Sequence, residues 1–285
     1  MTRTTITIAV VAAIMATAWI APAQDDPTTQ LRTIRIAGTE TIVETGVRDG
    51  QPFARVSRNG GADYEALEAP RTTLNFHYRV HDPVEGQPEI PGMLRSGSTR
   101  RLFVVQFHTQ PLAEYRAGLE ALGAEVHHYL ANQAYLVRMN AARVADARAL
   151  PYVRYVGRYE LAYKLEPAIV TMLRDGALGE ARRFQVMLVD SKRDEAALVA
   201  AIRRSGGVVD RVAAGGAFLE ATLDAIQLLE VASEDTVLWI DRWSAPEHDM
   251  DNARIQGGGD YIEPKKPEQY TGKGIRGMIY EGIYA

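Results

Sequence analysis

Apolar and polar residues alternate in the first part of the chain in the way that half-buried strands require. Two such stretches flank Asp49-Gly50, a residue pair that favours the tight turn of a β-hairpin. Between Thr72 and Val80, apolar side chains occupy every second position, which predicts another strand with one buried face. The prolines and glycines of 82–98 then indicate a linker.

Two later segments repeat one another. The segments 102–164 and 184–243 carry matching apolar patterns at a spacing of about 80 residues, which indicates one duplicated unit. Each predicts the order strand, helix, strand, strand, helix, strand. This is the order of the ferredoxin-like split motif, a four-stranded antiparallel sheet with both helices on one face. The repeat places Phe103 and Phe184 at equivalent positions in the two first strands.

The predicted fold class is therefore α+β, with two tandem ferredoxin-like βαββαβ modules preceded by a small β-rich segment. The predicted boundaries are a signal peptide at 1–23, the β-rich domain and linker at 31–98, the first module at 100–165, the second module at 182–245, and a final segment at 246–285.

Helix ends are marked by capping residues. Gly123 is expected to end the first helix of the first module in a left-handed conformation, and Asn140 to cap the second helix. In the second module, Thr222 is expected to cap a helix whose inward face includes Ile226 and Leu229. Inward positions of the first module form helical stripes at Leu112, Tyr115, Leu119, Leu122, Val144, Ala147 and Leu150. Between the modules, 166–179 predicts a helix and a turn broken by glycine.

The N-terminus has the pattern of an export signal. Arg3 is followed by the apolar run 6–20 and by Ala21-Pro22-Ala23, a small-x-small cleavage site. We expect cleavage after Ala23 and a secreted or periplasmic mature protein without a stable membrane span. The alternative is a retained membrane anchor, although the run is shorter than the roughly 20 residues that span a bilayer.

Composition excludes several functions. The chain has no cysteine, which rules out disulfides, thiolate catalysis and cysteine-ligated zinc. Its formal net charge is −4, and no basic stripe is present, so nucleic acid is not an expected partner.

Other chemistry-bearing residues favour structural interpretations. His77 and His81 are four residues apart, but the surrounding alternation predicts a strand rather than a metal-binding helix face. His127 and His128 are adjacent in a predicted strand and should point to opposite faces. No metal and no cofactor is expected. We expect core or interface packing for the four tyrosines Tyr152, Tyr155, Tyr159 and Tyr163. The alternative is a platform on which nucleic-acid bases stack. The glycines 257–259 lack the context of a phosphate loop.

Five segments of the chain resemble one family. The pattern of Phe103–Phe107, with Leu122–Ala124 and Leu150–Gly157, is similar to the inhibitor I9-like propeptide modules of subtilisin-like serine peptidases (subtilases, peptidase family S8). Further on, Thr271–Gly274 resembles the turn that leads into the first buried strand of their catalytic domain, and Ile275–Tyr280 resembles that strand. The resemblance implies pro-modules that chaperone and inhibit the adjoining peptidase.

Glu281 stands where these peptidases carry the aspartate of the catalytic triad. A carboxylate can orient a catalytic histidine, but the extra methylene of glutamate displaces it by about 1.5 Å, and a 1 Å error can cost about 100-fold in rate. No histidine is followed by glycine, and Gly-Thr-Ser does not occur, so the family's triad histidine and serine motifs are missing. We therefore expect no peptidase activity from this chain.

The sequence thus favours the pro-region and N-terminal portion of a secreted subtilisin-like serine endopeptidase. The implied partner is a subtilisin-like catalytic domain, in cis or in trans, which would act on a peptide or protein substrate. The alternative is a stand-alone secreted binding or protease-inhibitor protein with paired ferredoxin-like domains.

Overall fold

The computed structural model describes residues 30–212, 215–245 and 261. The chain divides into two units, Met1–Asp241 and Arg242–Ala285. The first unit is a mixed α/β structure with several antiparallel sheets and six helices, α1–α6, among the described residues. The expected signal peptide lies outside them. No helix in the described ranges has the length and apolarity that crossing a bilayer requires.

An antiparallel sheet opens the described chain, with its strands in sequence order. The hairpin predicted at Asp49-Gly50 is confirmed: both residues have positive φ, 53° and 74°, as a tight hairpin turn requires. The strands are β1 (Gln30–Arg35), β2 (Ile42–Arg48), β3 (Gln51–Ser57) and β4 (Glu65–Leu67).

The prediction of a single strand between Thr72 and Val80 is wrong. The chain forms a short hairpin instead, β5 (Leu74–Asn75) and β6 (Val80–His81), because the Phe76 amide donates to the Arg79 carbonyl and closes a turn. Val80 is consequently 57% exposed. The 82–98 segment is not a simple linker either: it includes the 3₁₀ turn η1 (Gly92–Leu94) and buries apolar side chains in the core.

The first module is a four-stranded sheet with the order β10-β7-β9-β8. Its first helix packs on β8 and its second on β10. Its strands are β7 (Leu102–Phe107), β8 (Glu125–Leu130), β9 (Ala134–Arg138) and β10 (Val153–Arg158), and its helical segments are α1 (Ala113–Ala121), η2 (Ala141–Arg143) and α2 (Val144–Ala149). The sheet of the second module is β12-β13-β11-β14, which is the same order read from the opposite edge. Its elements are β11 (Arg182–Leu188), α5 (Glu195–Arg204), β12 (Val208–Val212), β13 (Phe218–Leu223), α6 (Ala225–Ser233) and β14 (Val237–Arg242).

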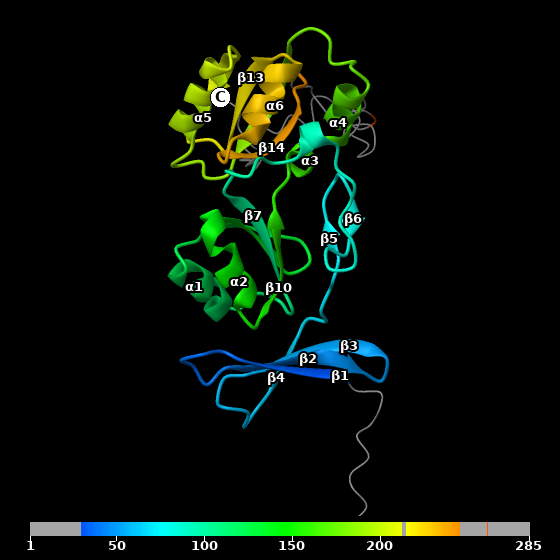
Figure 1. Cartoon of the computed structure of the whole chain (residues 1–285), viewed down its shortest axis with the longest axis vertical. Helices are drawn as coiled ribbons and strands as arrows, with labels where there is room; N and C mark the ends of the chain where they lie inside the picture. Colours follow the sequence, from blue (N-terminus) through cyan, green and yellow to red (C-terminus); the bar gives the residue numbers. More distant parts are fainter. Residues whose placement is uncertain (1–29, 213–214, 246–260, 262–285) are drawn as a thin grey trace, which may run out of the picture. The chain divides into compact units, whose positions relative to one another are not determined.

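In both modules the spatial order is fourth, first, third, second strand, with one helix after the first strand and one after the third. Figure 1 shows α5 and α6 side by side against the strands of their sheet. Phe103 and Phe184 both lie buried in a first strand, as the repeat predicts. Two short helices connect the modules, α3 (Leu161–Lys164) and α4 (Pro167–Arg174), which agrees with the expected helix and glycine turn.

The capping residues predicted from the sequence are found at helix ends in the first module, but a different residue is the cap in the second. Gly123 has a φ of 78°, which confirms the expected left-handed end of α1. The Asn140 side chain accepts from the Ala142 amide, so it caps the 3₁₀ turn η2 that leads into α2 rather than α2 itself. Thr222 instead lies in β13, and Asp224 caps α6 through a capping box with Gln227. This shifts the inward face of α6 to Leu228, Val231 and Ala232, and leaves Ile226 70% exposed.

The first strands of the two modules, β7 and β11, differ in how completely they are covered. Every residue of β7 is buried, because helices cover one face and the 74–94 segment packs on the other. In β11 only alternate residues are buried: Phe184, Val186 and Leu188 face the core, while Met187 is 37% exposed. The second module therefore has one sheet face that its own chain covers less completely.

Candidate functional site

The residues expected to carry chemistry divide into those outside the described ranges and those inside. Glu281 and the glycines 257–259 are outside. His77 packs on Trp239, with ring centroids 5.0 Å apart, and His81 lies beside Phe76 at 6.2 Å. Among the described residues, no group of three or more metal-ligating side chains is assembled.

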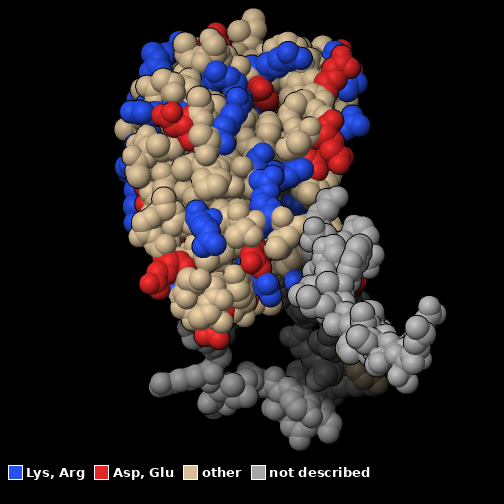
Figure 2. Space-filling model, turned by 60° about the horizontal axis from the view of Figure 1, so that its bottom comes forward, with Lys and Arg blue, Asp and Glu red and all other residues tan. Residues whose placement is uncertain are grey.

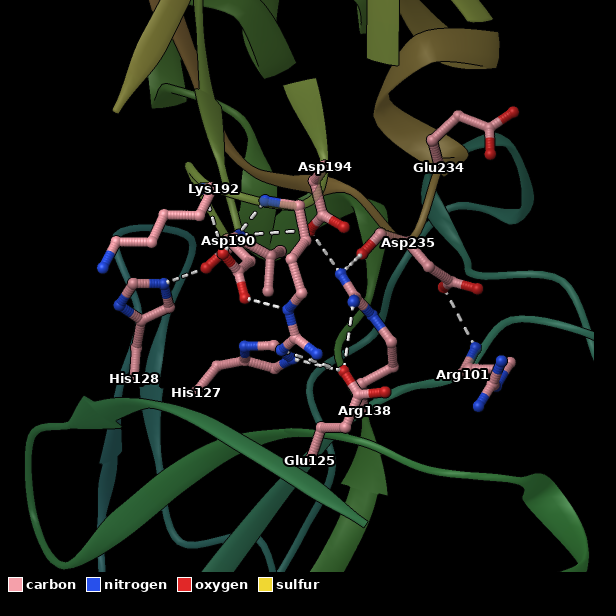
Figure 3. Close-up of polar contacts among 12 residues, drawn as sticks. Arg101, Glu125, His127, His128, Arg138, Asp190, Lys192, Asp194, Glu234 and Asp235 are labelled. Atoms are coloured by element: carbon pink, nitrogen blue, oxygen red, sulfur yellow. Dashed lines mark hydrogen bonds and ion pairs between the residues drawn. The ribbon is translucent and has the colours of Figure 1, made fainter. Parts of the chain in front are cut away.

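His127 and His128 do not point to opposite faces as expected. The pairing of β8 with β9 shifts register between Val126 and Tyr129, and this irregularity brings the two rings to 6.4 Å. Figure 3 shows both rings directed from β8 toward the loop that follows β11 in the second module and contains Asp190 and Lys192. The His128 Nε2 atom lies 2.7 Å from the Val189 carbonyl oxygen.

Arg138 is the centre of a polar network that joins the modules (Figure 3). Its Nη2 donates to Asp194 Oδ2 at 2.5 Å and to the Asp235 carbonyl at 2.9 Å, and its Nη1 donates to Glu125 Oε2 at 3.3 Å. The Arg138 side chain is 12% exposed and that of Asp194 is 8% exposed. Removing one partner of such a shielded pair is costly, because it leaves the other charge buried and unpaired.

Three further basic residues hold the turn that follows α6. Arg100 donates to Glu234 Oε2 at 3.0 Å and to the Ser233 hydroxyl at 2.8 Å, and the Arg101 amide donates to Asp235. The Lys164 Nζ donates to the carbonyls of Ala232 at 2.9 Å and Glu234 at 2.7 Å. These carbonyls belong to the C-terminal end of α6, where positive groups are favoured.

Lys164 is fully buried between the modules. Burial lowers the pKa of its ammonium to about 7, and the nearby Arg100 guanidinium acts in the same direction, opposed by the carboxylates of Asp235 and Glu234. Lys164, from the connecting helix α3, thus caps the C-terminal end of α6.

A cavity of about 590 Å³ lies where the N-terminal sheet meets the first module. The two parts share one apolar core, in which Ile34 and Val43 pack with residues of α1 and β7. Arg32 precedes Ile34 by two positions and faces the same side of β1, so its side chain reaches the end of β7. The lining residues are Leu31, Arg32, Thr45, Gly46, Val47, Pro52, Pro70, Arg71, Thr72, His108 and Arg154.

The cavity is basic, and no carboxylate is among its described lining residues. Arg32 Nη1 donates to His108 Nε2 at 2.6 Å. Burial, together with the charges of Arg32 and Arg154, lowers the pKa of His108 to about 4, so this imidazole is neutral near pH 7. Arg154 is itself occupied: its Nη2 bonds both oxygens of Asp82 at 2.7 Å, and its Nη1 bonds Gln106 Oε1 and the Thr72 carbonyl.

These contacts were not predicted from the sequence. Arg138 and Asp194 are far apart in the chain, as are Arg32 and His108, and no motif marks either pair. The one available signal was the alternation of β1, which places Arg32 on the face of Ile34. Elsewhere charges of both signs are mixed: Figure 2 shows Lys and Arg interspersed with Asp and Glu over one face.

Part of the chain matches a known protein family. Residues 71–160 match a family described as a domain of unknown function, DUF8729. This range covers less than half of the chain and includes the β5–β6 hairpin with the first module. The bonds from Arg154 to Asp82 and from Gln106 to the Thr72 carbonyl tie that hairpin segment to the module. No curated protein and no solved structure matched the chain.

Proposed function

We propose that this chain is the pro-region of a secreted subtilisin-like serine endopeptidase, and that its two modules are ferredoxin-like domains that chaperone and inhibit a subtilisin-like catalytic domain. The observation that carries the proposal is the strand order fourth, first, third, second, which occurs in both modules. The resemblance of 103–107 and 150–157 to subtilase pro-modules points to the same partner. A βαββαβ unit alone would support many functions, so the choice of partner rests on those segments and on 271–281.

The second module is the better docking surface. The first module buries β7 on both faces, whereas β11 leaves Met187 exposed. At the sheet edge, β12 has a described neighbour on one side alone, and its Val208 and Val212 are 58% and 38% exposed. An edge strand with exposed apolar residues is suited to pairing with a partner chain. We therefore place the catalytic domain on the β11 face and β12 edge.

The test is inhibition of subtilisin by the purified chain, measured with a chromogenic peptide. Met187→Glu introduces a charge on the proposed contact, and we expect the inhibition constant to rise about tenfold or more, as for a central contact residue. Ile226→Glu is the matched control, because Ile226 is an exposed apolar residue of the same module but lies on α6. It should leave inhibition unchanged.

Circular dichroism establishes that both variants are folded. Absence of inhibition by the unmodified chain, or equal loss in both variants, would contradict the proposal.

A second candidate is a stand-alone extracytoplasmic binding protein. The 590 Å³ cavity favours it, since the volume is that of small-molecule sites. The two candidates use different parts of the chain, and subtilisin inhibition separates them.

A further inference from the structure

The cavity between the N-terminal sheet and the first module has cationic groups without anionic partners. Of its three arginines, Arg154 is neutralised by Asp82, whose side chain is 8% exposed. Neither Arg32 nor Arg71 forms an ion pair with a carboxylate of the described residues. Two positive charges thus line a partly enclosed space, which favours an anion there.

The donors around this space are guanidinium groups rather than backbone amides. Gly46 and its neighbours in β2 lie in the middle of the sheet, paired with β1 on one side and β3 on the other. The N–H groups of this part of β2 are therefore used within the sheet and do not form the kind of nest that holds phosphate in many proteins. A guanidinium is planar and binds a carboxylate through two parallel hydrogen bonds, so the donor set suits a carboxylate.

The remaining walls are apolar. Leu31, Val47, Pro52 and Pro70 line the cavity, and Leu31 is 50% exposed. They can cover an aliphatic or aromatic body, while the arginines hold a charged head. The volume of about 590 Å³ accommodates a medium-sized organic acid.

His108 fixes the position of one arginine. Because the Arg32 guanidinium is always a donor, the imidazole accepts at Nε2 and carries its proton at Nδ1. Arg32 is in this way positioned over the cavity without losing its charge to a carboxylate. This is the arrangement expected of a preorganised anion site.

We propose that this cavity binds a carboxylate ligand with an apolar body, with Arg32 and Arg71 holding the carboxylate. The ligand is either a free organic acid or the C-terminal carboxylate of a peptide. The proposal does not rest on the docking surface of the second module, so it stands or fails independently of subtilisin inhibition.

The test is isothermal titration of the full chain with octanoate and with octanamide. Octanoate should bind, and octanamide, which has the same chain without the charge, should bind at least about tenfold more weakly. Arg32→Met and Arg71→Met should each weaken octanoate binding by about 10–100-fold, the effect of losing a charge-assisted hydrogen bond. Arg35→Met is the matched control, since Arg35 is exposed in β1 and does not line the cavity.

Two further probes refine and challenge the result. An N-acetylated dipeptide with an aliphatic C-terminal residue, compared with its amide, distinguishes a peptide C-terminus from a free acid. Tighter binding of octanoate identifies a free organic acid as the ligand, and tighter binding of the dipeptide acid identifies a peptide C-terminus. In either case, Arg32→Met must weaken the binding. Equal binding of octanoate and octanamide, unchanged binding in both cavity variants, or tighter binding of inorganic phosphate than of either carboxylate would overturn the proposal.

Discussion

Lys164 allows a sharp test of the contact between the modules. Its ammonium is buried and its pKa is lowered from an ordinary value of 10.5 to about 7. Below pH 7 the lysine is protonated in both the folded and the unfolded chain. Between pH 7 and 10.5 only the unfolded chain holds the proton, so the free energy of unfolding rises with pH across this window.

The size of the effect follows from the shift. Each pH unit within the window contributes about 1.4 kcal/mol, so between pH 6.5 and 9.0 Lys164 should add about 2.5 kcal/mol to the free energy of unfolding. In Lys164→Met this increment disappears. The variant also leaves the Ala232 and Glu234 carbonyls without their donor, which lowers stability at both pH values but does not change the slope.

The assay is urea unfolding followed by circular dichroism at pH 6.5 and 9.0, for the unmodified chain and for Lys164→Met. Lys192→Met is the matched control, because Lys192 is exposed and the same substitution there removes no buried amine. We expect the control to keep the rise of about 2.5 kcal/mol. Parallel pH dependence in the unmodified chain and Lys164→Met would refute the buried, deprotonated lysine.

Two further predictions concern the first module. Arg154→Met should lower the free energy of unfolding by about 3–5 kcal/mol, because it leaves the Asp82 carboxylate buried without its partner. Adding Asp82→Asn should restore much of this loss. A loss under about 1 kcal/mol in the single variant would contradict the prediction. Gly118→Ala in α1 should destabilise by about 1–3 kcal/mol although alanine favours helices, because the added Cβ meets the Tyr152 hydroxyl. Tyr152→Phe should relieve part of that cost in the double variant, and an additive result in thermal unfolding would show that this contact is not the cause.

Local signals in the sequence predicted local structure well. Asp49-Gly50, Gly123 and Asn140 each specify a turn or cap through their own backbone preferences. The first two were predicted correctly, and Asn140 caps the 3₁₀ turn that leads into the helix it was expected to cap. The duplicated pattern placed Phe103 and Phe184 in first strands, because the alternation of a half-buried strand is visible without tertiary information.

Features that depend on distant contacts were not predictable in this way. The 72–80 alternation suited a strand, but the turn at Phe76 and the packing of the 74–94 segment on β7 decided the outcome. Thr222 and Asp224 are both acceptable caps, and the length of β13 selected the second. The buried Lys164 has carbonyl partners that no sequence pattern identifies.

The candidate sites show the same division. Glu281 was proposed from a resemblance in a short motif and lies outside the described residues. The cavity joins Arg32 to His108 through the docking of the N-terminal sheet on α1 and β7, which is an event of tertiary packing. A network such as that of Arg138 likewise needs both modules to be placed before its members meet.

Hydrogen exchange of the full chain, alone and mixed with a subtilisin catalytic domain inactivated at its serine, tests the proposed function most directly. We predict slower exchange in the edge strand β12, residues Val208–Val212, while β7 is unchanged because its own chain already covers it. Unchanged exchange in β12, or protection confined to the strands β1–β4, would contradict the proposal that the second module receives the catalytic domain.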